Sequence, residues 1–264
     1  MVVALAAAAL GRAGDETVAP AAGSGTLREL NTDRPDVTES PFTIDAGHTQ
    51  LEMDLASVTR NQLDGVRTTE VSAGDFNLRF GITRSFELGL FLTPYLHRTE
   101  TPRGGPSVTT SGVGDAVVRG KWNFWGDDGG TTAFGLIVDV LLPTAARGLG
   151  EPHAVPAMTL PLALDLGHGW DAGAMTTVEA RPRDEGGYHG VWTNTLTLGR
   201  ELAHGVAGYA EIASTVGDGS HVATFDVGVT WKLDANTQLD AGTNLGITRA
   251  ADNLMVFAGV SRRF

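Results

Sequence analysis

Apolar and polar residues alternate along most of the chain after His48. In Gln50-Leu51-Glu52-Met53-Asp54-Leu55, every second residue is apolar, which is the pattern of a β-strand with two different faces. Eleven further stretches repeat this alternation: 75–80, 87–93, 115–124, 134–142, 158–166, 170–180, 190–199, 206–215, 222–233, 237–248 and 254–264. The pattern therefore predicts an all-β domain of about twelve antiparallel strands.

The lengths of the strands and their connections favour one β architecture. Most strands have about 9 to 13 residues, which suits a tilted strand that crosses a bilayer better than a strand of a globular sheet. Short connections lie at 83–85, 126–130, 167–169, 200–205 and 234–236, whereas 99–112 and 143–155 are longer. Short periplasmic turns and longer extracellular loops are typical of outer-membrane barrels. We therefore expect a single transmembrane β-barrel.

The two faces of the predicted strands differ in chemistry. The apolar face carries aromatic residues near the short turns, namely Phe80, Phe86, Trp122, Phe124, Phe134, Trp170, Trp231 and Phe264, with Trp192 at the opposite end and Arg262 as its single charge. Trp and Phe at strand ends are expected for an interfacial girdle. The polar face carries Glu52, Asp54, Asp75, Glu87, Asp115, Asp139, Asp165, Asp171, Glu179, Glu211, Asp226, Asp240, Arg79, Arg119, Lys121, Lys232 and Arg263.

A hydrated lumen tolerates these charges, whereas a Lys or Arg that faces lipid at the midplane costs roughly 2–4 kcal/mol. Twelve acids against five bases give the predicted wall a net charge of −7. The alternative is a soluble β-sandwich, in which the same charged face would be the solvated outside. Pro161 lies within a predicted strand, and because a closed barrel has no free edge, we expect a bulge or a shifted register there.

Composition narrows the function classes further. The 264 residues include 31 acidic and 19 basic ones, a net charge of −12, and no cysteine. Nucleic acid is an unsuitable partner for such a chain, because that affinity comes from clustered Lys and Arg. Disulfides and thiolate metal sites are excluded as well. No stretch approaches the ~20 apolar residues of a membrane helix.

The N-terminal region is organised differently from the rest. Residues 1–14 contain the apolar run Val2 to Leu10 and then small residues, which resembles the remnant of a secretory signal peptide. Residues 15–47 lack periodicity and are rich in Gly, Pro, Asp, Ser and Thr, so we expect a lead-in or plug segment. The barrel is expected to span 48–264. Phe264 closes a strand that resembles the C-terminal recognition strand of outer-membrane barrels, which implies the barrel-assembly machinery as a partner.

Two sequence blocks indicate a family. The first is Leu30-Asn31-Thr32-Asp33-Arg34-Pro35-Asp36-Val37-Thr38-Glu39-Ser40-Pro41, followed by Ala46-Gly47-His48-Thr49-Gln50-Leu51-Glu52. The second is Gly112-Val113-Gly114-Asp115 leading into Arg119, Lys121, Trp122 and Asn123. Together they resemble the outer-membrane transporter family that is named for the meta-pathway of phenol degradation. The resemblance implies a barrel of the Gram-negative outer membrane that moves small molecules.

Candidate site residues fall into two groups. Asp33, Arg34, Asp36 and Glu39 form the motif of the N-terminal segment, which we expect to fold against the periplasmic mouth or to enter the lumen, with Arg34 paired to an inward carboxylate. The alternative is a solvated tether. Asp75, Arg79, Asp115, Arg119, Lys121, Asp139 and Asp226 are the candidates that line the solute path. Each of these residues could instead brace the barrel through an ion pair.

Catalytic patterns do not stand out. The seven histidines lie at predicted strand ends, turns or loops, and strand alternation places none beside a serine. There is no G-x-S-x-G, H-E-x-x-H or phosphate loop. We therefore predict a passive, porin-like channel for small solutes, hydrophobic or aromatic ones included, that is not an enzyme and uses no metal or cofactor. The alternatives are a closed structural or binding barrel and a lipid-modifying enzyme.

Overall fold

The computed structural model describes residues 27–183 and 186–264, so the predicted signal remnant at 1–14 lies outside the described residues. Regular structure in the described part consists of β1 (Thr49–Leu63), β2 (Val66–Ala73), β3 (Phe76–Thr83), β4 (Phe86–Leu92), β5 (Tyr95–Pro102), β6 (Val108–Gly112), β7 (Ala116–Trp125), β8 (Thr132–Leu142), β9 (Val155–Gly167), β10 (Trp170–Pro182), β11 (Tyr188–Ala203), β12 (Val206–Gly217), β13 (Ser220–Asp234), β14 (Thr237–Gly246) and β15 (Leu254–Arg263). Within it, no helix is long and apolar enough to cross a membrane.

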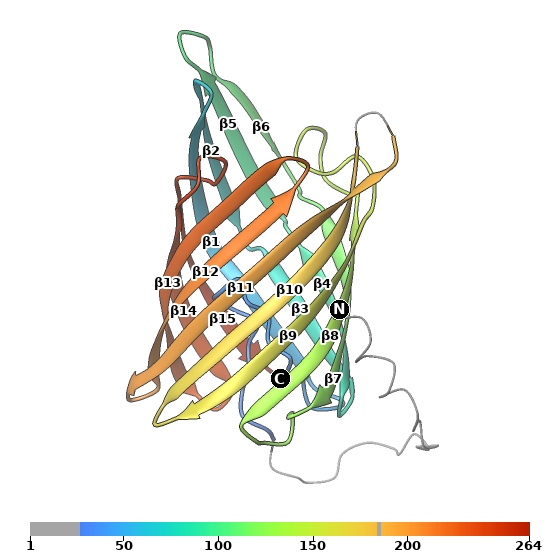
Figure 1. Ribbon diagram of the computed structural model, residues 1–264, viewed down its shortest axis with the longest axis vertical. Coiled ribbons are helices and arrows are strands. Elements are labelled where there is room, and N and C mark those ends of the chain that lie inside the picture. The colour runs from blue at the N-terminus through green and yellow to red at the C-terminus, as the bar shows by residue number, and fades with distance from the viewer. Residues whose placement is uncertain (1–26, 184–185) are drawn as a thin grey trace.

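The strands form one closed antiparallel barrel (Figure 1). Each strand from β7 to β15 pairs with the next, and β15 pairs back onto β1 from Gln50↔Arg263 to Arg60↔Leu254. The wall has twelve strands, because β2 continues into β3, β4 into β5 and β6 into β7 across short interruptions. The predicted number of strands and their antiparallel order are confirmed.

Three strand segments were not predicted. β2, β5 and β6 extend the wall beyond the expected strands, and β5 and β6 rise above the rest of the barrel in Figure 1. The expected long connection at 99–112 is therefore mostly paired strand around a turn at 103–107. The alternation is weak there because Thr, Ser and charged residues occupy both faces, as in Arg67-Thr68-Thr69-Glu70.

The two rims differ less in connection length than the sequence suggested. We call the rim with the turns at 84–85 and 168–169 the turn rim and the opposite one the loop rim. The loop rim has the long connection 143–154, but also the two-residue turns Asp64-Gly65 and Asp218-Gly219. Both residues of each of these turns have positive φ, which type I′ hairpins require.

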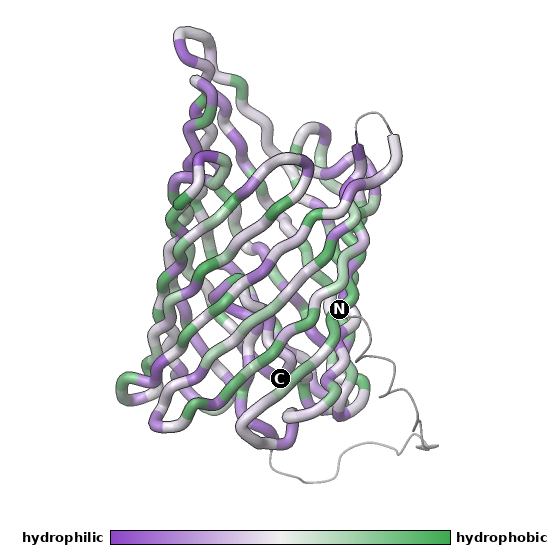
Figure 2. The backbone as a smooth tube through the Cα atoms, in the orientation of Figure 1, coloured by the Kyte–Doolittle hydropathy of each residue, from purple (hydrophilic) through white to green (hydrophobic). Residues whose placement is uncertain are grey.

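The barrel is apolar outside and charged inside. At mid-wall, Leu196 is 61% exposed on the outer face, while the inward carboxylate residue Asp226 is 0% exposed. Hydrophobic and hydrophilic positions alternate along the wall strands in Figure 2. A soluble β-sandwich would bury the apolar face, so that alternative is wrong.

Aromatic residues surround the barrel near the turn rim. Phe124, Trp125 and Trp231 are at least half exposed there, as an interfacial girdle requires. One detail of the prediction is wrong, because Arg262 is not the only outward charge. β11 runs past its predicted end, and outward Arg200 lies over the ring of Trp170, 4.5 Å from its centroid. This contact keeps the charge at the boundary of the apolar belt.

Pro161 does not produce the expected bulge. It pairs in register with Met175 of β10, and the pairs Phe134↔Leu162 and Ile137↔Thr159 on the β8 side keep one register around it. The two intervening pairs are missing, so the ladder is interrupted where proline has no N–H to donate. A local gap in the hydrogen-bond ladder between β8 and β9 thus replaces the predicted bulge or register shift.

Candidate functional site in the barrel lumen

Residues 27–47, here called the luminal segment, lie inside the half of the barrel next to the turn rim (Figure 1). The segment has no strand partner, and wall carboxylates accept its backbone N–H groups instead. Val37 N and Thr38 N donate to the two oxygens of Glu211 at 2.8 Å, and Ile44 N donates to Glu87 at 2.8 Å. Charge-assisted bonds of this kind are stronger than neutral ones.

Arg34 anchors the luminal segment to the wall. Its Nη2 lies 2.6 Å from Asp240 Oδ1 and 2.9 Å from Asp54 Oδ1. Burial alone would lower the pKa of Arg34, but hydrogen bonding to Asp240 and the charges of both aspartates outweigh it and raise the pKa. Gly259 pairs with Asp54 on one side and with Asp240 on the other. A Cβ at Gly259 would overlap the guanidinium, so this glycine forms the slot that admits Arg34.

Asp33 and Glu39 bind a cluster of three wall cations. Lys121 Nζ lies 2.5 Å from Asp33, and Arg119 holds both oxygens of Glu39 at 2.6 Å. Arg79 lies 3.5 Å from Asp33. Burial would raise the pKa of Asp33, but the charges of Arg79, Lys121 and Arg119 outweigh it and hold the pKa below its ordinary value. The luminal segment therefore supplies anions where the wall is basic.

The same cations also brace the wall. Arg79 donates to Glu87 at 2.8 Å and to Glu52 at 2.5 Å. Arg119 donates to Asp139 of β8 at 2.8 Å through two nitrogens. The predicted path residues Arg79, Arg119 and Lys121 thus contact the luminal segment, and Asp139 pairs with Arg119. Buried pairs of this kind specify an arrangement more than they add stability.

The opposite wall is mostly acidic, and its cation Lys232 of β13 lies near the turn rim, paired with Glu29. Glu211 and Asp226 are cross-strand neighbours on β12 and β13, and neither forms a salt bridge in the part of the chain that the structure describes. Asp36 of the luminal segment lies on this side. Burial raises the pKa of Asp36 and the nearby charge of Glu211 raises it further.

The side chains of two further predicted path residues, Asp115 and Asp75, accept hydrogen bonds from outside the luminal segment. Asp115 accepts Ala145 N and Glu151 N, both at 2.8 Å. It therefore ties down the 143–154 connection at the loop rim, which is a structural role. Asp75 accepts a hydrogen bond from Ser72 and lines a cavity of about 180 Å³ together with Phe76 and Phe91.

Sequence reasoning missed the glycines that make room for the luminal segment. A Cβ at Gly81 would overlap the backbone oxygens of Ile44 and Asp45, and Gly259 is the second case. Both occupy inward positions among large polar residues. An inward glycine in such a face is the signal that could have identified a close approach.

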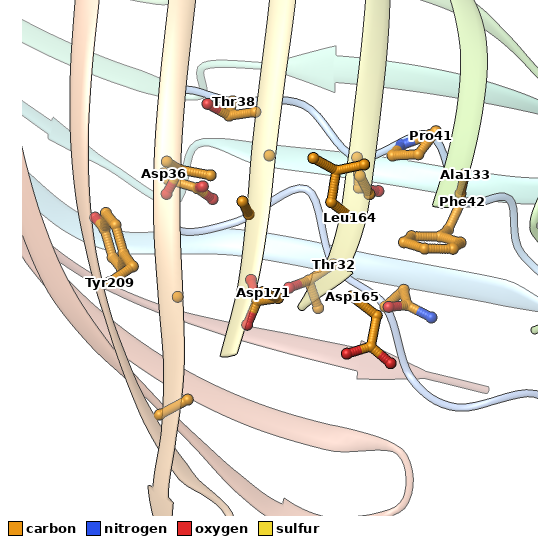
Figure 3. A pocket seen from close by; sticks show the side chains of 18 of the residues that line it. Thr32, Asp36, Thr38, Pro41, Phe42, Ala133, Leu164, Asp165, Asp171 and Tyr209 are labelled. Carbon is orange, nitrogen blue, oxygen red and sulfur yellow. The ribbon is translucent and has the colours of Figure 1, made fainter. Parts of the chain in front are cut away.

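A larger cavity separates the luminal segment from the wall on the acidic side. It has a volume of about 460 Å³, and strands β8 to β13 line it. Asp36, Asp165, Asp171 and Tyr209 surround it together with the apolar residue Phe42 (Figure 3). It reaches the turn rim at 130–132 and is therefore a vestibule beside the luminal segment.

The fold brings two histidines beside serines that strand alternation did not place together. His97 lies within β5, a strand that was not predicted, and its Nδ1 is 2.7 Å from Ser111 Oγ on β6. His221 Nε2 lies 3.1 Å from Ser214 Oγ. The second ring nitrogen of His97 faces the hydroxyl of Thr99 at 3.4 Å, whereas a serine hydrolase orients this nitrogen with a carboxylate. No group of three or more potential metal ligands occurs among the described residues.

Solved outer-membrane barrels share this architecture. The β-domain of the Bordetella autotransporter Brka aligns with a TM-score of 0.56 and 14% identity, covering 83% of this chain and 100% of that chain. The NanC porin aligns with a TM-score of 0.53 and 7% identity, covering 80% of this chain and 98% of that chain. At such identities the likeness establishes the fold, a transmembrane β-barrel.

No curated protein matches the chain in a sequence comparison. A family profile does match, over residues 32–264, and this range includes both the luminal segment from Thr32 onward and the whole barrel. The match agrees with the resemblance carried by the Asp33-Arg34-Pro35 block. The chain belongs to the family described as "Putative MetA-pathway of phenol degradation".

Proposed function

We propose that this protein is a passive channel of the bacterial outer membrane and that the luminal segment is its plug. The carrying observation is the polar attachment of that segment. A segment packed by apolar contacts would expose apolar surface to water when it moves. A segment held by carboxylate and guanidinium contacts can exchange these contacts for water and ions. Arg79, Lys121 and Glu87 are 0% exposed, so at their level the described lumen is filled, and conduction requires the segment to move.

The solutes that we propose are small and include hydrophobic or aromatic compounds. Support comes from the family description, which refers to phenol degradation, and from the barrel fold shared with porins. The protein is not an enzyme in this proposal, since transport across such a barrel requires only a path and a gradient. The bilayer and the barrel-assembly machinery, through the strand that ends at Phe264, are its proposed partners.

The test is conductance of the purified full chain in a planar bilayer. Arg34→Gln should shift the opening equilibrium by more than about a hundredfold, because it leaves Asp240 buried without its cation, and removing one partner of a buried pair costs about 3–5 kcal/mol. Arg249→Gln is the matched control, since the Arg249 side chain is 83% exposed and pairs with Asp64 outside the lumen.

A closed binding barrel is the alternative function, and the dense contacts of the luminal segment favour it. It predicts that the folded wild type and R34Q both remain silent. Measurable and equal conductance of wild type and R34Q would instead exclude the luminal segment as the gate. Heat-shifted migration on a gel verifies folding in each case.

A further inference from the structure

The vestibule beside the luminal segment contains an unbalanced set of charges. Asp165 and Asp171 are directly opposite each other on β9 and β10, an arrangement of like charges that normally destabilises a sheet. Neither forms a salt bridge with any cation in the described ranges 27–183 and 186–264. Lys232 lines the same cavity, but Glu29 neutralises it at 2.5 Å.

Polar groups without partners also line this cavity. Thr197 is only 7% exposed, and its Oγ1 has no hydrogen-bond partner among the described residues. Within the same part of the chain, the hydroxyl of Tyr209 is likewise buried without a partner, and its side chain stands at the cavity beside Asp36 in Figure 3. Unsatisfied buried groups in a native protein indicate a missing water, ion or ligand.

Part of the lining is apolar. The side chain of Phe42 stands at the cavity in Figure 3, and the inward residue Ala163 of β9 also lines it. A volume of about 460 Å³ is within the range of small-molecule sites. An inorganic cation would satisfy the carboxylates but would leave the apolar surface in contact with water.

We propose that this vestibule is a binding site for a small organic cation, a protonated amine on an apolar body. The ammonium group lies between the carboxylates of Asp165 and Asp171, and the apolar body contacts Phe42 and Ala163. The inference deepens the proposed channel function, since it makes the vestibule the binding site for cationic solutes at the turn rim. Binding itself does not depend on transport, but the role of this site in transport rests on the proposed function.

Binding to the full chain in detergent, measured by calorimetry, tests the site without any transport. The probes are benzylammonium, benzyl alcohol and benzoate, which share a ring and differ in charge. Benzylammonium should bind the wild type more tightly than the other two. The double variant Asp165→Asn with Asp171→Asn should weaken it by about tenfold, as expected for two partly exposed ion pairs.

The double variant Asp128→Asn with Asp218→Asn removes the same charge at exposed turns and should bind like wild type. Tyr209→Phe removes only a hydroxyl and should weaken binding severalfold, which keeps the test valid if the vestibule variant fails to fold. Absence of benzylammonium binding to the wild type, equal binding of benzoate, or equal losses in both double variants would overturn the site. Binding without any bilayer conductance would overturn the channel and leave the site standing.

Discussion

At the scale of single residues, Gly259 determines where the luminal segment can attach. It lies between Asp54 and Asp240 on adjacent strands, and the missing side chain leaves room for the guanidinium of Arg34. Arg34 also lies over the ring of Phe257, 5.6 Å from its centroid. The slot therefore combines two anions, an aromatic ring and an absent Cβ.

We predict that Gly259→Ala expels Arg34 and loosens the whole luminal segment. Overpacking a filled site costs about 1–3 kcal/mol, which corresponds to roughly 5- to 150-fold more frequent opening. Hydrogen exchange of the amides of Val37 and Thr38, which Glu211 accepts, measures this opening. Gly190→Ala is the control, because its added Cβ meets only Trp192 at an ordinary 3.6 Å. Unchanged exchange in G259A would disprove the slot.

At the scale of elements, the luminal segment is held by side chains of the wall instead of a β-ladder. Pro35 and Pro41 lack N–H groups, and neighbouring backbone amides donate hydrogen bonds to carboxylates of the wall. Thr38 Oγ1 also lies 2.6 Å from Thr195 Oγ1 of β11. Because the chain has no cysteine, a disulfide introduced at this contact would be its only one.

We predict that Thr38→Cys with Thr195→Cys locks the channel when oxidised. The bridge fixes the luminal segment to the wall, so conductance should fall to the background and return on reduction. Thr193→Cys with Thr215→Cys is the matched control, since these hydroxyls lie 2.8 Å apart on adjacent wall strands. Conduction through a fully oxidised T38C/T195C protein would show that solutes pass without movement of this segment.

At the scale of the whole molecule, the luminal charges are divided between two sides. The side of β3 and β7 carries Arg79, Arg119 and Lys121, each paired with acids. On the side of β12 and β13, Glu211 and Asp226 have no salt bridge among the described residues, and Lys232 lies at the turn rim, paired with Glu29. The luminal segment follows this division, with Asp33 and Glu39 on the basic side.

We predict that the open channel prefers cations. The inward residues of the wall are mostly acidic and the basic ones are already paired, so a permeating anion meets no free positive charge in the described lumen. The reversal potential under a salt gradient should have the sign of cation selectivity, and the selectivity should weaken at high salt. An anion-selective reversal potential would contradict this picture of the lumen.

The fold was largely predictable and the site only in part. Alternation around Leu196 and Asp226 identified the two faces correctly, because each position depends only on its neighbours in the strand. The strands β2, β5 and β6 were missed because the wall there has no apolar face. Asp115 was assigned to the solute path, and its partners Ala145 N and Glu151 N on a connection were not foreseen, since alternation shows which face a residue occupies but not its partner.

By itself, the sequence determined the barrel, the orientation of its faces and the family, because period-two alternation and short motifs are local properties. Only the tertiary structure decided the contacts of the lumen. Thr38 meets Glu211 across 173 positions and Arg34 meets Asp240 across 206. Such pairs exist only after barrel closure sets the register of every strand, and the vestibule of Asp165 and Asp171 is the space that this closure leaves beside the luminal segment.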